Sequence, residues 1–188
     1  MRTVSVFNFI SLDGCFEGPV KGDIGWHRHD EVGRAYAVEM IARGNVLLFG
    51  RVTYDIMSSY WPTEAARSSD PVMAEGMNNA GKIVFSRTMD KAAWSNTTVI
   101  KDDVVERVRE IKRSGGTNLT ILGSGSIVKL FAENNVIDEY QFMVDPVVLG
   151  SGRRIFDGIE KRLRLTLKAT RVFRNGSVLL IYNPAGED

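Results

Sequence analysis

The sequence predicts an α/β fold built on a mixed β-sheet, and three observations support that prediction. Short β-favouring runs alternate with segments of helical periodicity over the first two-thirds of the chain, a pattern typical of parallel strands joined by crossover helices. The last two β-favouring runs are joined through Asn175-Gly176, the strongest short signal for an antiparallel hairpin. The 188 residues are 44% hydrophobic and contain no linker, repeat or low-complexity segment, so we expect one domain over residues 1–188.

The first expected elements are a strand, a long loop and a helix. Residues 3–11 form an alternating pattern that predicts a strand, and the turn-rich segment after them predicts a loop to about residue 28. A helix is expected to begin after Asp30, its candidate N-cap, and to end before Gly44. At near-helical spacing, the residues expected to face the core are Val32, Ala35, Val38 and Ile41.

The middle of the chain repeats this alternation of strand and helix. Residues 45–50 predict a short buried strand and residues 51–60 a short helix. A polar loop is expected over 61–71, a helical turn around 72–77, and further strands over 82–86 and 97–100. The next helix has Asp102 or Asp103 as its candidate N-cap. Its inward residues are expected to be Val104, Val105, Val108 and Ile111.

The last third opens with a strand, a glycine-serine loop and a helix over residues 120–131. A strand over 139–148, a second glycine loop over 149–156 and two closing strands over 162–173 and 177–184 complete the chain. Because crossover connections give parallel pairs and the closing hairpin adds antiparallel edges, the sheet is expected to be mixed.

Composition excludes several classes of protein. The 24 basic and 23 acidic side chains nearly cancel, so no overall field draws the protein to nucleic acid or to a membrane. The single cysteine, Cys15, forms no internal disulfide, and with two histidines the chain offers no Cys/His zinc site, so no metal is expected. Because the first residues run directly into a strand pattern and no segment approaches membrane-spanning length, we expect a soluble protein of the cytoplasm.

Three of the expected strands end in residues that suit anions. The end of a buried strand and the start of the next helix leave unpaired N–H groups and a partial positive charge, to which these residues add glycines, hydroxyls and guanidinium groups. An extra arginine is also what an adenosine 2′-phosphate requires, which favours NADP over NAD. The structural alternatives are a solvated arginine, a polar loop and a tight turn. The residues concerned are Gly50, Arg51, Thr53, Ser86, Arg87, Thr88, Gly123, Ser124, Gly125, Ser126 and Ile127.

The common catalytic fingerprints are absent from the sequence. The segment "GSGSIV" has Val128 where a G-x-G-x-x-G motif requires its third glycine, and no G-K-[ST] follows a glycine-rich loop. No G-x-S-x-G elbow, H-E-x-x-H helix or nucleophile beside a histidine is present. Phosphate-binding strand ends without a nucleophile or metal favour an enzyme in which a cofactor carries the reaction.

The ordered set of motifs resembles a known family. "SLDG" after the first strand, "FGRVTYD" after the second, "VFSRT" after the third, and then "ILGSGSIVKLF" and "DEYQFMVDPVVLGSGRRIF" resemble the dihydrofolate reductase-like superfamily. The match is strongest with the reductase domain of the bifunctional riboflavin-biosynthesis deaminase-reductase and covers essentially the whole chain. The resemblance implies a three-layer α/β/α sandwich around a mostly parallel sheet of about eight strands, with NADPH lying across the strand ends.

The resemblance also assigns residues to the cofactor. It implies that Gly50, Arg51 and Thr53 hold cofactor phosphate. Ser86, Arg87 and Thr88 would hold the adenosine 2′-phosphate end, and Gly123 to Ile127 the pyrophosphate. Residues 11–14, including Leu12 and Asp13, would border the nicotinamide, although Asp13 in Asp-Gly is also an ordinary turn former.

On the substrate side the resemblance points to Trp26 and Asp30. Dihydrofolate reductases place an acid near the start of their first helix, and Asp30 lies in roughly that place, where it would anchor an amino-pyrimidine edge and help to deliver a proton. The alternative for Asp30 is an N-cap alone. His27 and His29 are expected to be exposed loop residues or, less simply, to bind substrate phosphate or deliver a proton. Arg153 and Arg154 are expected to be surface charges or contacts to a ribose phosphate.

These observations favour an NADPH-dependent reductase of a pteridine, a ribosylamino-pyrimidine or a related heterocycle. The H-x-E and P-C-x-x-C zinc signature of a deaminase is absent, so the deamination step is excluded. The alternatives are a catalytically silent nucleotide-binding module of the same fold and an enzyme acting on a phosphorylated metabolite without nicotinamide. A homodimer is expected, because related reductase domains are often dimers and the closing hairpin would otherwise leave an unprotected edge.

Overall fold

One mixed sheet forms the centre of the protein. We describe a computed structural model of the chain over residues 1–27 and 30–186, so His29 lies outside the described residues. The eight strands of the main sheet lie in the order β5-β4-β3-β6-β1-β7-β10-β9, and β2 pairs with β8 in a separate ribbon. Every neighbouring pair is parallel except β7 with β10 and β10 with β9. The mixed sheet with a C-terminal hairpin confirms the predicted fold class.

The strands mostly follow the predicted runs. Residues 15–17 and 153–154 form the short ribbon inside segments that were expected to be loops. The strands are β1 Val4–Ser11, β2 Cys15–Glu17, β3 Val46–Gly50, β4 Lys82–Phe85, β5 Thr97–Ile100, β6 Leu119–Leu122, β7 Glu139–Asp145, β8 Arg153–Arg154, β9 Leu165–Val172 and β10 Val178–Pro184.

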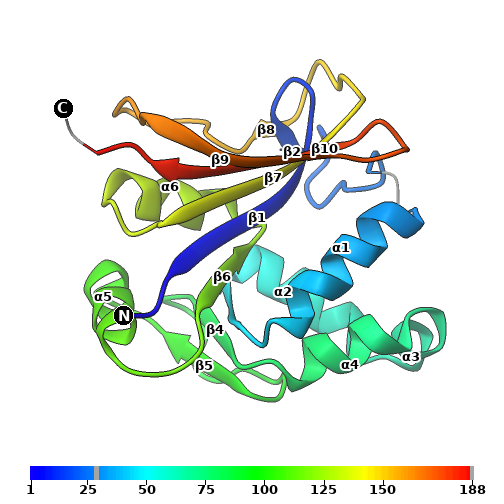
Figure 1. Cartoon of the computed structure of the whole chain (residues 1–188). Helices are drawn as coiled ribbons and strands as arrows, with labels where there is room; N and C mark the ends of the chain where they lie inside the picture. The colour runs from blue at the N-terminus through cyan, green and yellow to red at the C-terminus, as the bar shows by residue number, and fades with distance from the viewer. Residues whose placement is uncertain (28–29, 187–188) are drawn as a thin grey trace.

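The helices cover both faces of the sheet, which gives the three layers (Figure 1). Side chains from α5 and α6 pack with Val4 and Val6 of β1 on one face, whereas α1, α2 and α4 pack on the other. The helices are α1 Glu31–Ala42, α2 Arg51–Tyr60, α3 Glu64–Ser69, α4 Pro71–Asn79, α5 Val104–Arg113 and α6 Gly125–Glu133. Among the described residues, no helix has the length and apolarity needed to cross a membrane.

Two expectations about helices were wrong. The segment predicted as a polar loop contains α3, because Thr63 accepts a hydrogen bond from Ala66 N and so caps a helix of six residues. In α1 the buried residues are Gly33, Tyr36 and Met40, not the predicted stripe, of which Ala35 is exposed. Tyr36 is buried because its hydroxyl donates to Gln141 Oε1 of β7 at 2.8 Å, so a polar partner in the sheet sets the rotation of the helix.

The order of the strands places a topological switch point beside β1. After β1 the chain continues to α1 on one face of the sheet, and after β6 it continues to α6 on the opposite face. The neighbouring strands β1 and β6 therefore send their connections to opposite sides. Ligands of open α/β sheets bind at such a point, outside the carboxyl ends of the strands. A ligand site is therefore expected at the ends of β1, β3, β6 and β7.

Candidate functional site

The ends of β3 and β6 are joined by the side chain of Ser124. Its hydroxyl accepts a hydrogen bond from Gly50 N at 2.8 Å and donates to Thr53 Oγ1 at 2.8 Å. Ser124 is 6% exposed and adopts a left-handed conformation with φ 60°, which turns its side chain inward toward α2. Ser124 therefore fixes the two loops to each other instead of presenting its hydroxyl to a ligand.

Glycines permit the close approach of these two loops. A Cβ atom on Gly123, whose φ is 61°, would lie 3.1 Å from Thr53 Cγ2, and one on Gly50 would lie 3.2 Å from Ile127 Cγ1. Such contacts are tighter than ordinary packing, so a larger residue at either position would push α2 and α6 apart. The structure thus brings Gly50, Thr53, Gly123, Ser124 and Ile127 together, as the sequence predicted.

The N-termini of α2 and α6 lie side by side and are both without a side-chain cap. Gly50 precedes α2, Ser124 precedes α6, and neither supplies a capping hydrogen bond. Asp30, Thr63 and Asp70 cap α1, α3 and α4, whereas α5, which starts elsewhere on the sheet, also has no side-chain cap, although Asp103 precedes it. The first N–H groups of an uncapped helix lack acceptors and carry the positive end of the helix dipole. Two adjacent termini of this kind form a local site for a phosphate or pyrophosphate.

The other residues predicted to bind the cofactor differ in exposure and in whether their side chains already have partners. Arg51 forms an ion pair with Asp55 one turn along α2, with Nε 2.7 Å from Oδ2. Ser86 is buried and its hydroxyl accepts from Met89 N, whereas Arg87 and Thr88 are exposed after β4. Ser126 is exposed in the first turn of α6, beside Gly125. Among the described residues Arg87 forms no ion pair, so its guanidinium remains available to an anion.

Asp13 organises the loop after β1. Its carboxylate accepts from Ser11 Oγ at 2.7 Å, from Leu149 N at 3.1 Å and from Gly150 N at 2.9 Å. The hydrogen bond from Ser11 is the main cause that lowers the pKa of Asp13 to about 2. A carboxyl group held ionised in this way does not suit the role of proton donor. The neighbouring Leu12 is 68% exposed on the same loop.

Asp30 caps α1 and holds the closing hairpin. Its Oδ1 accepts from Val32 N and Gly33 N, each at 3.0 Å, and its Oδ2 accepts from Asn175 Nδ2 at 2.6 Å. These bonds, the one from Gly33 first, lower the pKa of Asp30. Both oxygens are therefore engaged within the protein, which supports the N-cap alternative over contact with a substrate ring. Arg153 is likewise paired, with Glu17 at 2.8 Å, and Arg154 donates to Asp13 O.

A buried polar cluster that the sequence did not predict lies beside Asp30. His27 Nδ1 is 2.5 Å from Asp145 Oδ2, and Ser177 Oγ donates to Asp145 Oδ1 at 2.9 Å. His27 stacks on Phe9, with 3.7 Å between ring centroids. His27 was expected to be exposed, and it is instead 8% exposed because Asp145, the last residue of β7, gives it a partner. In the sequence, only the polar Asp145-Pro146 at the end of an apolar strand could have indicated this buried cluster.

Two buried polar atoms near this edge lack hydrogen-bond partners. They are Asn8 Oδ1, in β1, and Trp26 Nε1, in the loop before α1. A buried acceptor without a donor is costly, and such groups often mark a site that a ligand completes. An acceptor at the β1–β6 switch point and the helix N-termini of α2 and α6 fit a ligand that has both an amide group and phosphates. The residues present therefore fit a nicotinamide dinucleotide.

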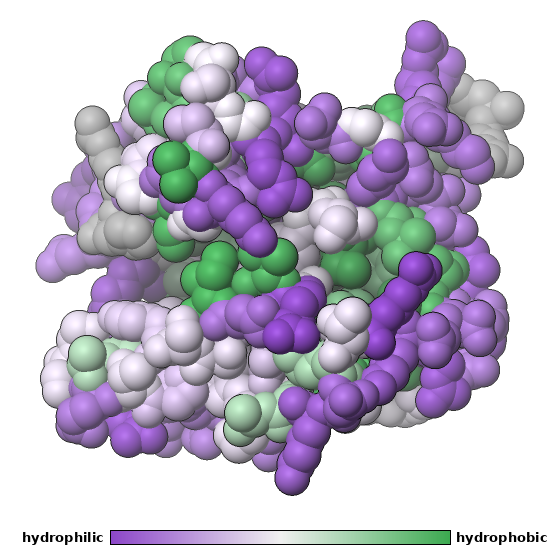
Figure 2. Space-filling model, turned by 180° about the vertical axis from the view of Figure 1, so that it is seen from behind, coloured by the Kyte–Doolittle hydropathy of each residue, from purple (hydrophilic) through white to green (hydrophobic). Residues whose placement is uncertain are grey.

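Exposed apolar side chains gather over the same region. The loop after β1 presents Leu12, Val20 and Ile24, and α2 presents Val52, Ile56 and Tyr60. A Cβ on Gly22 would lie 3.5 Å from Ile56 Cδ1, so this loop lies against α2. Seen from behind, apolar side chains cluster across the middle of the molecule (Figure 2). Such a surface suits an aromatic ligand.

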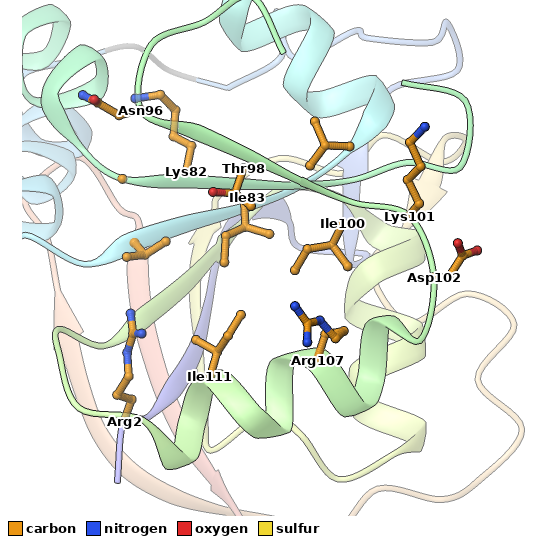
Figure 3. Close-up of a pocket in the computed structure, with 13 residues that line it drawn as sticks. Arg2, Lys82, Ile83, Asn96, Thr98, Ile100, Lys101, Asp102, Arg107 and Ile111 are labelled. Carbon is orange, nitrogen blue, oxygen red and sulfur yellow. The ribbon is translucent and has the colours of Figure 1, made fainter. Parts of the chain in front are cut away.

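A second hollow lies away from these strand ends. A pocket of about 570 Å³ lies between α5 and the strands β4 and β5, with Ile83, Ile100 and Ile111 at its centre (Figure 3). Arg2 and Arg107 point into it. It has neither a glycine loop nor a helix N-terminus of α2 or α6, so the strand ends remain the candidate site.

Comparison with known proteins identifies the family of the chain. The family model described as the RibD C-terminal domain matches residues 2–179. The chain belongs to this family. The chain is also 27% identical over 175 residues to YyaP of Bacillus subtilis, an uncharacterised protein, and the match covers 93% of this chain and 90% of YyaP.

Solved structures share the fold of this RibD C-terminal domain. A deaminase/5-amino-6-(5-phosphoribosylamino)uracil reductase from Thermotoga maritima superposes with a TM-score of 0.69 and 17% identity, over 98% of this chain and 57% of the bifunctional enzyme. Dihydrofolate reductase from Enterococcus faecalis, complexed with NADP(H), superposes with a TM-score of 0.65 and 17% identity, over 98% and 97% of the two chains. The family and the dihydrofolate reductase-like fold expected from the motifs are thus both confirmed.

Proposed function

We propose that this protein is an NADPH-dependent reductase of a nitrogen heterocycle, in the class of ribosylamino-pyrimidines and pteridines. The observation that carries the proposal is the pair of uncapped N-termini of α2 and α6, held side by side by Ser124. Family membership supports it, as do the uracil reductase and the NADP(H)-bound reductase among the structures of the same fold.

Separate groups of the chain would bind each part of the cofactor. The first N–H groups of α6, at Gly125 and Ser126, and those of α2 would hold the pyrophosphate. The exposed guanidinium of Arg87, which forms no ion pair within the described part of the chain, would hold the 2′-phosphate that distinguishes NADPH from NADH. When bound, the cofactor supplies a hydride to a C=N or C=O bond of the substrate.

The proton for this reduction is assigned to His27. Asp13 and Asp30 have their carboxylates engaged by internal hydrogen bonds. His27 is instead held through Nδ1 by a buried carboxylate, the arrangement that orients an imidazole for acid–base work. The variant His27→Gln should keep the affinity for NADPH and lower turnover by about 10²-fold or more.

Cofactor binding is the first test. Quenching of tryptophan emission should give a lower Kd for NADPH than for NADH, and Arg87→Ala should remove that difference. Arg67→Ala, which changes an exposed arginine of α3, is the matched control and should leave both Kd values unchanged. Equal affinity of the wild-type protein for the two dinucleotides would contradict the assignment of Arg87.

Turnover is the second test. Oxidation of NADPH should be followed at 340 nm with 5-amino-6-(5-phosphoribosylamino)uracil, dihydrofolate and oxidised pterins as substrates. Oxidation that depends on one of them supports the reductase. Tight NADPH binding with no oxidation across the panel would favour the alternative, a silent nucleotide-binding module.

The homodimer remains part of the proposal. In the described residues the outer edge of β9 has no paired strand, and Leu167 and Val172 on it are 52% and 75% exposed. An exposed edge strand offers unpaired N–H and C=O groups with which a strand of a second chain could pair. Light scattering after gel filtration should give twice the mass of 20.9 kDa. A monomer at micromolar concentration would refute this part.

A further inference from the structure

Asn8 is a polar residue in an apolar row. Along β1, the residues on the face toward α5 and α6 are Val4, Val6, Asn8 and Ile10. Asn8 is 5% exposed, and its Oδ1 atom has no hydrogen-bond partner. An apolar residue of similar size would avoid the cost of that buried acceptor. Packing therefore does not explain why an asparagine stands there.

The place of Asn8 in the sheet points to a ligand. The pairing of β1 with β6 ends at Phe7 and Leu122, so Asn8 is the first residue of β1 beyond it. On its other side Asn8 is still paired, with Phe142 of β7. Asn8 thus lies where β6 leaves the sheet toward α6, at the switch point between two strands whose connections take opposite faces of the sheet. In open α/β sheets such a point is the usual place for a ligand.

We propose that Asn8 Oδ1 accepts a hydrogen bond from the carboxamide N–H of a bound nicotinamide ring and so contributes to cofactor specificity. The inference rests on the proposed function and names a recognition residue for it. Oδ1 is an acceptor and requires a donor, and the carboxamide is the part of the ring that offers one. The adjacent N-terminus of α6 suits the phosphates of the same molecule.

The test compares two cofactors that differ by one group. In the 3-acetylpyridine analogue of NADPH a methyl group replaces the carboxamide NH₂, so the analogue keeps its shape and loses the donor. The wild-type protein should bind NADPH about tenfold more tightly than the reduced analogue. The variant Asn8→Leu should bind NADPH and the analogue with equal Kd, because leucine offers no acceptor to the carboxamide of NADPH.

A control and an independent readout accompany this comparison. Arg87→Ala should weaken both cofactors by the same factor and leave their ratio as in the wild type. In the absence of any ligand, Asn8→Leu should raise the midpoint of urea denaturation, because it removes the unpaired acceptor. That second measurement also establishes that the variant folds.

The outcomes separate this inference from the function on which it rests. If the wild type binds NADPH but does not discriminate against the analogue, or if Asn8→Leu keeps the wild-type ratio, the role of Asn8 is refuted and the reductase stands. A buried water would then be the partner of Oδ1. If the wild type binds neither dinucleotide, both the function and the inference fail.

Discussion

His27 Nδ1 lies 2.5 Å from Asp145 Oδ2, and both side chains are almost wholly buried. The pair joins the loop that precedes α1 to the last residue of β7, and Ser177 Oγ, at the start of the closing strand, adds a third segment. Because these segments are far apart in the sequence, the pair fixes one side of the candidate site. His27 and Asp145 depend on each other, because a buried charged group is costly once its partner is removed.

Replacing Asp145 should therefore be strongly destabilising. Asp145→Asn leaves His27 without its carboxylate and should lower the free energy of unfolding by about 3 kcal/mol. Ser177→Ala removes only one neutral hydrogen bond donor to the same carboxylate and should cost about 1 kcal/mol. Urea denaturation of the three proteins measures both values. A smaller loss for Asp145→Asn than for Ser177→Ala would show that the pair is not the central interaction.

Ser124 should matter for stability and Ser126 should not. Ser124→Ala removes the acceptor of Gly50 N and the donor to Thr53 Oγ1, so we expect a loss of about 2 kcal/mol in unfolding free energy. Ser126 is exposed one helical position beyond Gly125, and Ser126→Ala should change stability by less than about 0.5 kcal/mol. Chemical denaturation compares the two. Equal effects would contradict the inward orientation of Ser124.

Asp13 should make stability depend on acid pH. The pKa of Asp13 is about 2 in the folded protein, chiefly because of Ser11, and about 3.9 for an unfolded aspartate. A carboxyl group whose folded pKa is depressed stabilises the protein fully above its unfolded pKa, and that contribution disappears as the pH falls through the folded pKa. The difference in urea midpoint between wild type and Asp13→Asn should therefore shrink between pH 4 and pH 2. A constant difference would refute the assignment.

The sequence predicted most of the framework because the deciding interactions are local. Periodicity locates the strands, Asn175-Gly176 locates the hairpin turn, where Gly176 has φ 89°, and Asp30 begins α1 by accepting from its first N–H groups. The rotation of α1 was missed because Tyr36 is buried by a bond to Gln141, more than 100 residues away. The spacing of apolar residues contains no information on such a partner.

The sequence predicted which loops of the candidate site approach each other, but it did not predict the buried hydrogen bonds of the polar side chains there. Glycines after a strand signal a close approach of loops, and Gly50 and Gly123 do approach the opposite loop closely. The sequence could not show that Ser124 turns inward or that Arg51 pairs with Asp55, because side-chain direction depends on the tertiary structure. His27 with Asp145 and the unpaired Asn8 likewise become visible only when β1 and β7 lie together.

Lys82 offers a test of how burial and hydrogen bonding compete. It is 2% exposed, and its ammonium group donates to Met77 O, Asn78 O and Ala80 O at the end of α4, with the ring of Trp94 4.4 Å away. Lys82→Met keeps the apolar stem but leaves these carbonyl groups without a donor. We expect a loss of about 2 kcal/mol in unfolding free energy at pH 7.

The pH dependence of that loss distinguishes the two effects. Burial lowers the pKa of Lys82 to about 8, against about 10.4 for an unfolded lysine, so between these values the unfolded chain binds more protons than the folded one. Wild-type stability should therefore rise relative to Lys82→Met from pH 8 to pH 10, as measured by urea denaturation at several pH values. A gap that stays constant would mean that the three carbonyl groups stabilise the ammonium enough to offset its desolvation.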